Sequence, residues 1–195
     1  MMREQEILQL FREAGAFLEG HFLLTSGLHS PFYVEKFKLL QRPKYVELLA
    51  CELLERFSRI SPDIVVGPAV GGIILAYEVA RQLGVDMAFT ERENGKMKFR
   101  RDFNLCRENT VLIVEDVVTT GSSAQEVIEV VEEIGASIVG VGILVDRSGG
   151  KIKFQYPLHH LLQMEVKTYL PDECPLCQEQ VDLQKRGSRN LSADL

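Results

Sequence analysis

Tryptophan is absent from this chain of 195 residues, and cysteine occurs only four times. So few cysteines cannot form the disulfide framework of a small secreted protein, and we therefore expect reduced thiols and a core held by apolar packing. No apolar run approaches the roughly 20 residues that span a bilayer, and the charged, amphipathic N-terminus lacks the apolar centre of a signal peptide. These absences predict a cytoplasmic protein with no membrane partner.

Positive charge is also scarce, because 22 Lys and Arg residues stand against 28 Asp and Glu residues and give a net charge of −6. An acidic chain is a poor general ligand for the phosphate backbone of nucleic acids, so we expect no nucleic-acid partner. The apolar fraction of 46% and the charged fraction of 26% are typical of a globular protein. The length allows one domain with a sizeable core and a small appendage.

Hydrophobic periodicity predicts helices that alternate with short apolar strands along most of the chain. The predicted helices are 3–15, 43–57, 73–83 and 122–134, and the predicted strands are 63–66, 85–92, 99–105, 111–114, 137–145 and 158–166. This alternation predicts a mostly parallel, twisted sheet flanked by helices on both faces. The helix 122–134 begins with Ser-Ser-Ala-Gln, which fits a capping box. Two short strands within 21–36, around a turn at 28–30, predict an appendage that could cap a site.

The stretch from Val111 to Ser123 carries the strongest functional signal. Four apolar residues predict a buried strand, Glu115 and Asp116 follow at its expected end, and a run of Thr, Gly and Ser leads into the next helix. In an open α/β sheet, ligands bind at the carboxyl ends of strands, where small residues beside a helix N-terminus can surround a phosphate. Adjacent carboxylates suit sugar hydroxyls or a divalent cation. The stretch therefore predicts a sugar-phosphate site, and an ordinary turn between a strand and a helix is the alternative.

Two more loops are expected at the same edge of the sheet. Residues 67–72 form a small-residue loop after the first core strand, and residues 146–150 place Asp146 and Arg147 before two glycines. Because parallel strands end on the same side, these two loops and residues 116–123 should line one pocket. A charged turn without a ligand is the alternative for residues 146–150.

Several of these segments resemble a known family. The stretch from Val111 to Ser123 resembles the phosphoribosyl pyrophosphate (PRPP) signature of type I phosphoribosyltransferases. Residues 21–36, with Ser26-Gly27 and Ser30-Pro31-Phe32-Tyr33, are similar to the N-terminal hood of the orotate phosphoribosyltransferases, and Val145-Asp146-Arg147 resembles their segment with an orotate-binding arginine. The resemblance implies a type I phosphoribosyltransferase-like α/β fold with a mostly parallel sheet, flanking helices and a small hood.

The likeness also implies a division of the chain. We expect a single phosphoribosyltransferase domain over residues 1–170, with the hood in 1–40 and the core in 41–170. Residues 171–195 are polar and poorly patterned, which favours an extended or partly disordered C-terminal tail.

The resemblance implies a reaction and the residues that perform it. Orotate and PRPP would give orotidine 5′-monophosphate and pyrophosphate, a step of pyrimidine biosynthesis, with Mg²⁺ carried by PRPP and not held directly by the protein. The positions implied to bind PRPP are Arg92, Lys96, Arg100, Glu115, Asp116, Val117, Val118, Thr119, Thr120, Gly121, Ser122 and Ser123. Those implied to bind orotate are Phe32, Tyr33, Thr119 and Arg147, and those implied in catalysis are Lys96, Lys98 and Asp116.

The basic segment 92–101 is the implied lid of this site. In the family such a loop closes over the pyrophosphate, usually from the neighbouring subunit, which implies a homodimer with shared active sites. Its lysine spacing departs from the commonest pattern, so Lys96 and Lys98 are both candidates for the catalytic lysine, with Arg100 and Arg101 as further pyrophosphate contacts. A solvated hairpin tip is the alternative.

Two other functions compete with orotate transfer. A phosphoribosyltransferase for another base, such as a purine, would not need Arg147, because a neutral purine has no carboxylate to pair with an arginine. A PRPP-binding regulator without catalysis would need an effector domain, for which a core that begins by about residue 20 leaves no room.

The sequence Cys174-Pro-Leu-Cys177 has the spacing of half a zinc knuckle. Two cysteines supply only two of the four ligands of a structural zinc ion, so His159, His160 or a partner subunit would have to supply the others. A loose pair of reduced thiols is the alternative.

Overall fold

The computed structural model describes residues 2–24, 26–57 and 60–186. Thr25 of the expected hood and residues 187–195 of the expected tail lie outside the described residues. No helix within the described ranges is both long and apolar enough to cross a membrane.

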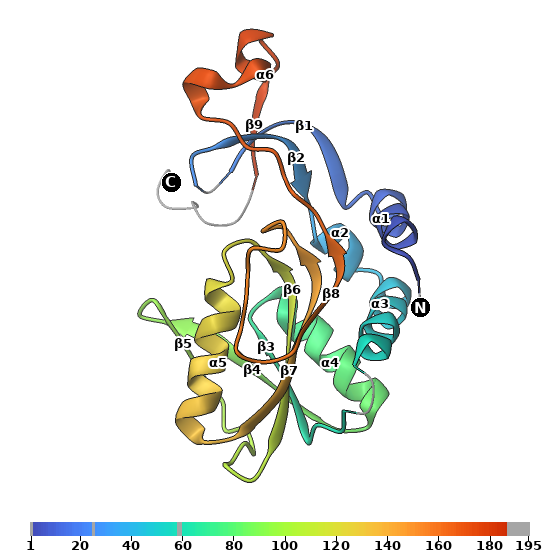
Figure 1. The fold of residues 1–195 in the computed structure, drawn as a ribbon, viewed down its shortest axis with the longest axis vertical. Helices are drawn as coiled ribbons and strands as arrows, with labels where there is room; N and C mark the ends of the chain where they lie inside the picture. The colour runs from blue at the N-terminus through green and yellow to red at the C-terminus, as the bar shows by residue number, and fades with distance from the viewer. Residues whose placement is uncertain (1, 25, 58–59, 187–195) are drawn as a thin grey trace.

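A six-stranded sheet forms the centre of the molecule (Figure 1). Its strands, in spatial order, are β5 (Lys96–Lys98), β4 (Asp86–Glu93), β3 (Ile64–Pro68), β6 (Thr110–Val118), β7 (Ser137–Asp146) and β8 (Leu158–Gln163). All neighbours pair in parallel except β4 and β5, which form an antiparallel hairpin. The predicted fold class is therefore confirmed.

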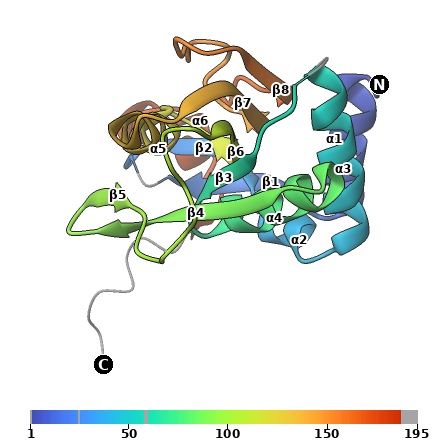
Figure 2. The same ribbon diagram turned by 90° about the horizontal axis from the view of Figure 1, so that it is seen from below.

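Helices cover both faces of this sheet, as the two views at right angles show (Figures 1 and 2). Helix α5 (Ser122–Ile134) lies on one face, and α3 (Pro43–Arg56) and α4 (Gly71–Leu83) lie on the other, with α1 (Glu4–Glu13) and the short α2 (Phe37–Leu40) beside them. The side chains of β6 alternate accordingly: Leu112 joins the core beneath α3 and α4, whereas Val111 and Ile113 join the core beneath α5. Burial on both faces explains the nearly continuous apolar run of this strand.

A second, three-stranded sheet forms the hood above the strand ends (Figure 1). Strands β1 (Phe17–Leu23) and β2 (His29–Val34) pair antiparallel, which confirms the predicted pair of strands, although β1 begins before residue 21. The predicted turn at 28–30 is wrong, because His29 and Ser30 already pair with β1. Strand β9 (Leu183–Lys185), from the far end of the chain, pairs with β1 in parallel. The hood sheet therefore joins strands that are far apart in the described sequence, β1 and β9.

The expectation that the tail is extended or disordered is wrong as far as Arg186. After a 3₁₀ turn (Pro171–Glu173) and the one-turn helix α6 (Pro175–Gln178), the chain returns to the hood as β9. Local sequence patterns missed this segment because three strand residues paired with a distant partner have no periodicity of their own.

The predicted strand 99–105 is also wrong. The hairpin turns at Asn94 and Gly95, which both have positive φ (51° and 84°), and returns as the short β5. Residues 99–105 have no strand pairing, and Phe103 is partly buried against the core under α5, with its ring 5.1 Å from that of Phe89. Apolar side chains here reflect packing of an irregular segment and not a strand.

Candidate active site

The three predicted loops meet at one edge of the six-stranded sheet, because β3, β6 and β7 are parallel neighbours. Two of these segments come close together at Gly71, which opens α4, and Asp116 near the end of β6. A Cβ atom on Gly71 would collide with Oδ2 of Asp116 and would lie 3.2 Å from Nζ of Lys36. Position 71 must therefore be glycine for the loop before α4 to reach the carboxylate.

The two acidic residues lie inside β6 and not after its end as predicted. Pairing with β7 continues as far as Val118 opposite Asp146, so the strand includes both carboxylates. Glu115 and Asp116 are 6% and 1% exposed, and buried carboxylates need partners.

Asp116 finds its partner in Lys36, which follows the hood strand β2. The ammonium Nζ lies 3.0 Å from Oδ1 and 2.8 Å from Oδ2 of Asp116, and the backbone N–H of Val117 donates to Oδ1 at 2.7 Å. The pair joins residues 80 positions apart and connects the hood to the floor of the site. Sequence patterns gave no hint of Lys36, because the contact depends on the tertiary fold.

Glu115 forms no ion pair among the described residues, although the charge of Lys36 partly opposes the rise of its pKa. Its Oε1 accepts the backbone N–H of Asp116 at 3.0 Å, a single neutral donor. Burial, followed by the adjacent charge of Asp116, raises the pKa of Glu115 well above its ordinary value. Burial thus shifts the Glu115 carboxyl toward its protonated form, which can donate as well as accept hydrogen bonds.

The phosphate loop is the segment 119–123, which leads from β6 into α5. The predicted capping box is wrong: the N-cap is Gly121, with a left-handed φ of 82° and no side-chain cap. Thr120 and Ser122 are exposed and bonded to each other through their hydroxyls at 3.1 Å. Within the described chain the N–H groups of Thr119, Thr120 and Gly121 donate to no other protein group. Free donors at a helix N-terminus suit an anion.

An open cleft of about 600 Å³ extends from this loop toward the segment after β7. Besides residues 119–122, its lining includes Ser148, Ile152 and two lysines, Lys151 and Lys153. Sequence reasoning missed these lysines, although two basic residues shortly after an Arg-containing strand end were a usable signal. The cleft combines N–H groups, hydroxyls and positive charge, which is the chemistry of a phosphate site.

Arg147 lies at the end of β7 and is mostly buried. Its backbone N–H donates to Val118 at 2.8 Å, while its Nε atom is buried without a hydrogen-bond partner. Burial lowers the pKa of Arg147. Burial also raises the pKa of Tyr33, and the positive charge of Arg147 partly opposes that rise. The charge of Arg147, in the core, is thus felt by Tyr33, in the hood.

The neighbours of these two residues have supporting roles. Asp146 accepts the N–H groups of Ser148 and Gly150 at 2.7 and 3.2 Å, and so fixes the turn that carries Arg147. Phe32 stacks on Phe17 of β1 with ring centroids 5.2 Å apart, inside the hood.

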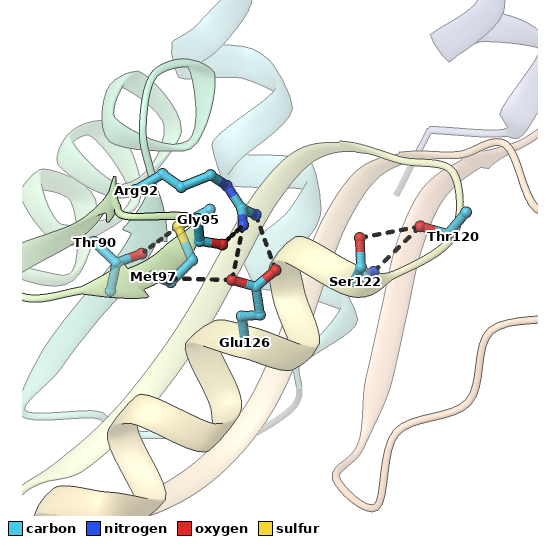
Figure 3. A network of polar contacts seen from close by, with 7 residues as sticks. All are labelled: Thr90, Arg92, Gly95, Met97, Thr120, Ser122 and Glu126. Atoms are coloured by element: carbon cyan, nitrogen blue, oxygen red, sulfur yellow. Dashed lines mark hydrogen bonds and ion pairs between the residues drawn. The ribbon is translucent and has the colours of Figure 1, made fainter. Parts of the chain in front are cut away.

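The β4–β5 hairpin is attached to the side of α5 (Figure 3). Both terminal nitrogens of Arg92 pair with the carboxylate of Glu126, at 3.0 and 2.9 Å, and the backbone N–H of Met97 donates to the same carboxylate at 3.1 Å. Figure 3 also shows Ser122 at the start of the same helix and Thr120 in the loop that precedes it. Within this chain Arg92 holds the hairpin on α5 and does not contact the phosphate loop.

The other basic residues of the hairpin differ in whether they form ion pairs. Lys96 is exposed and has no ion-pair partner in the part of the chain that the structure describes. The remaining three pair with acidic residues of the hairpin's own first strand at 3.1–3.2 Å: Lys98 and Arg100 with Glu93, and Arg101 with Glu91.

The Cys pair of the tail lies away from this site and does not meet the histidines expected from the sequence. His159 is on β8, where its ring packs edge-on against Phe57 at 4.6 Å, and His160 is the next residue of that strand. The cluster of potential metal ligands that forms among the described residues consists of His21, His29, Cys174 and Cys177.

Comparison with known proteins agrees with this geometry. Residues 39–168 match the model of the phosphoribosyl transferase domain. The chain is 50% identical to the orotate phosphoribosyltransferase of Caldanaerobacter subterraneus over 97% of this chain and 100% of the relative, and 50% identical to that of Chlorobium phaeobacteroides over 98% and 99%.

Solved structures share the fold. The crystal structure of orotate phosphoribosyltransferase from Aeropyrum pernix superposes with a TM-score of 0.70 at 24% identity, covering 82% of this chain and 94% of that one. The adenine phosphoribosyltransferase from Rhodothermus marinus gives a TM-score of 0.63 at 20% identity, covering 82% and 99%. The fold is thus shared by enzymes named for different bases and does not select one.

The chain belongs to the phosphoribosyltransferase family. Its full-length similarity places it among the orotate phosphoribosyltransferases of that family.

Glu115 generates a prediction for stability against pH. Because its pKa is raised by folding, the folded protein keeps a proton that the unfolded chain loses above the ordinary pKa of 4.5. This group's contribution to stability is therefore fully present below that pH and is lost as the pH rises through the raised pKa. Glu115→Gln removes this loss of stability with rising pH. The difference in free energy of unfolding, variant minus wild type, should therefore increase with pH, as measured by urea denaturation from pH 4 to 8.

The matched control is Glu133→Gln, on the exposed side of α5. This variant should keep the pH profile of the wild type. Parallel profiles for the wild type and Glu115→Gln would show that burial does not perturb the Glu115 carboxyl.

Proposed function

We propose that the chain transfers the ribose 5-phosphate of PRPP to orotate, releasing pyrophosphate and forming orotidine 5′-monophosphate. The observation that supports the choice of base is Arg147, whose Nε atom is buried without a hydrogen-bond partner among the described residues. Arg147 follows β7 and pairs through its backbone with Val118, at the sheet edge that also holds the phosphate loop. A buried cation without a partner is costly, and a planar carboxylate such as that of orotate would pair with it bidentately. A neutral purine offers no such group.

The remaining residues at this edge of the six-stranded sheet fit PRPP. We assign the 5-phosphate to the free N–H groups and hydroxyls of the loop 119–123, and the ribose hydroxyls to Glu115 and Asp116. Departure of pyrophosphate makes the ribose ring electron-poor, and carboxyl oxygens near the ring tolerate that charge. The base nitrogen is itself the attacking group, so no residue of the chain has to act as a nucleophile. Lys36 acts here as a positioning residue, because it holds the Asp116 carboxylate.

Mg²⁺ fits this site as an ion carried by the substrate. Lys36 already forms an ion pair with the Asp116 carboxylate, and burial raises the pKa of Glu115, so these two carboxyl groups are poor direct ligands for Mg²⁺. When bound to the diphosphate of PRPP, the ion would neutralise charge on the leaving group. The chain's own residues would bind the ribose and the phosphate around it.

The proposal is tested by incubating the protein with PRPP, Mg²⁺ and either orotate, uracil, adenine or hypoxanthine, and by following pyrophosphate release. Pyrophosphate should form with orotate and not with the purines. Turnover with a purine and none with orotate would assign a different base. Pyrophosphate release that needs no added base would contradict transfer to orotate and transfer to a purine alike.

Arg147→Lys should raise the KM for orotate by about tenfold to a hundredfold, the cost of losing a bidentate charged contact. The KM for PRPP should change little, because Arg147 is placed on the base and not on the phosphates. Steady-state kinetics with each substrate varied in turn separate the two constants. Arg107→Lys, an exposed arginine paired with its neighbour Glu108, is the control and should behave as the wild type. Equal orotate KM values for the two variants would remove Arg147 from the base site.

We further propose that the hairpin closes over the pyrophosphate of a second copy of the chain in a homodimer. Its attachment to α5 supports this proposal, since Arg92 is held by Glu126 of its own chain. Lys96 is exposed and forms no ion pair with any described residue.

Shared sites predict complementation. Lys96→Ala/Lys98→Ala chains and Arg147→Lys chains should each be weakly active alone, and purified mixed dimers should recover up to about one half of the wild-type activity because one of the two sites in each mixed dimer is intact. Activity is measured after co-expression and separation by two different tags. Mixed dimers no more active than the average of their parents would place the hairpin over its own chain's site.

A further inference from the structure

A cluster of four side chains at the far end of the hood is separate from the proposed PRPP and orotate site. His21 lies on β1 and His29 on β2. Cys174 precedes the one-turn helix α6, and Cys177 lies within it. One potential ligand atom from each residue lies within 4.8 Å of the other three. The cluster thus unites residues from near the two ends of the chain.

The distances match those around a tetrahedral zinc ion. With Zn–N bonds of about 2.0–2.1 Å and Zn–S bonds of about 2.3 Å, tetrahedral ligands lie about 3.3 Å apart for N and N and about 3.5 Å apart for S and N. The two ring nitrogens, Nε2 of His21 and Nδ1 of His29, lie 2.9 Å apart. The sulfur of Cys177 is 3.7 Å and 3.2 Å from these nitrogens, and that of Cys174 is 3.5 Å from Nε2 of His21.

The orientation of His21 supports a ligand role. Its Nδ1 atom is 2.8 Å from the carbonyl oxygen of Val181, and a carbonyl can only accept, so Nδ1 carries the proton. The lone pair of Nε2 is then directed at His29 and the two sulfurs. A backbone carbonyl that fixes the free nitrogen of a ligating histidine is a common outer-shell contact in metal sites.

The tail offers a second, independent observation. From Leu170 to Arg186 every residue is exposed or partly exposed except Cys174, which is fully buried. Val181 and Leu183 are 39% and 45% exposed, so apolar burial contributes little to holding this segment in place. Short segments without a core commonly depend on a disulfide or a metal ion, and Cys174 and Cys177 are both free thiols.

We propose that His21, His29, Cys174 and Cys177 bind one structural Zn²⁺ ion that fastens the C-terminal segment to the hood. Two thiolates and two imidazoles form the ligand set that favours zinc over harder ions such as Mg²⁺. Four protein ligands leave no open position, so the ion is structural and not catalytic. The site goes beyond the transferase activity and does not rest on it.

The ion also stabilises the hood. Strand β2 runs from His29 to Phe32 and Tyr33, the residues assigned to the orotate side of the pocket. Fastening His29 to β1 and to the tail keeps this strand in register, in addition to the backbone hydrogen bonds between His29 and Tyr169.

The test measures metal content on tag-free protein purified without chelator, by plasma mass spectrometry. The wild type should contain about one zinc ion per chain, and Cys174→Ser/Cys177→Ser should contain less than about one tenth of that. The matched control is Cys51→Ser/Cys106→Ser, which removes the two other cysteines, both exposed, and should keep the wild-type zinc content. Zinc retained by Cys174→Ser/Cys177→Ser would overturn the proposal.

Two further measurements use the wild-type protein and do not depend on the folding of a variant. Removal of zinc by a chelator should lower the midpoint of thermal unfolding by about 5–10 °C, and added ZnCl₂ should restore it. Protein loaded with Co²⁺ should show intense visible bands of a tetrahedral ion with thiolate ligands. A zinc-free wild type that has four titratable thiols and gives no tetrahedral Co²⁺ spectrum would contradict the site.

Discussion

The architecture of this protein depends on one crowded point at the carboxyl end of β6. There Asp116 is buried, paired with Lys36 from the hood, and in van der Waals contact with Gly71 at the start of α4. Three segments that are remote in sequence can meet only because position 71 carries no side chain. The ion pair compensates the desolvation of the carboxylate, and it ties the hood to the core at the place where the sugar is proposed to bind.

From that point the site extends in two directions. Toward α5, free N–H groups and hydroxyls of the loop 119–123 offer an anion site at a helix N-terminus, with Lys151 and Lys153 across the cleft. Toward the hood, Arg147 has a buried guanidinium nitrogen, Nε, with no hydrogen-bond partner among the described residues. A sugar phosphate and a planar carboxylate are the two chemical groups that this edge can satisfy together. The proposed zinc cluster lies at the opposite end of the hood, where it would hold β1, β2 and the C-terminal segment together.

The sequence was sufficient for features that depend on local pattern. The apolar run 111–114, the helix 122–134 and the small-residue loops predicted a parallel sheet with one functional edge, because strand and helix periodicity and the order of elements determine that edge. Long-range contacts were not predictable. Lys36 joins Asp116 across 80 positions, and His21 lies 153 positions from Cys174, so no local pattern connected them. The strand expected over 99–105 failed because apolar residues packed without backbone pairing resemble a strand in sequence.

The central claim is that the hood and the strand-end carboxylate act as one unit through Lys36 and Asp116. A double-mutant cycle tests it most directly: the free energy of unfolding is measured by urea denaturation for the wild type, Lys36→Met, Asp116→Asn and the double variant. Lys36 is about one third exposed, so we predict a coupling energy of about 1 kcal/mol, between the values of surface and buried ion pairs. Additive effects, with a coupling below about 0.3 kcal/mol, would contradict the account.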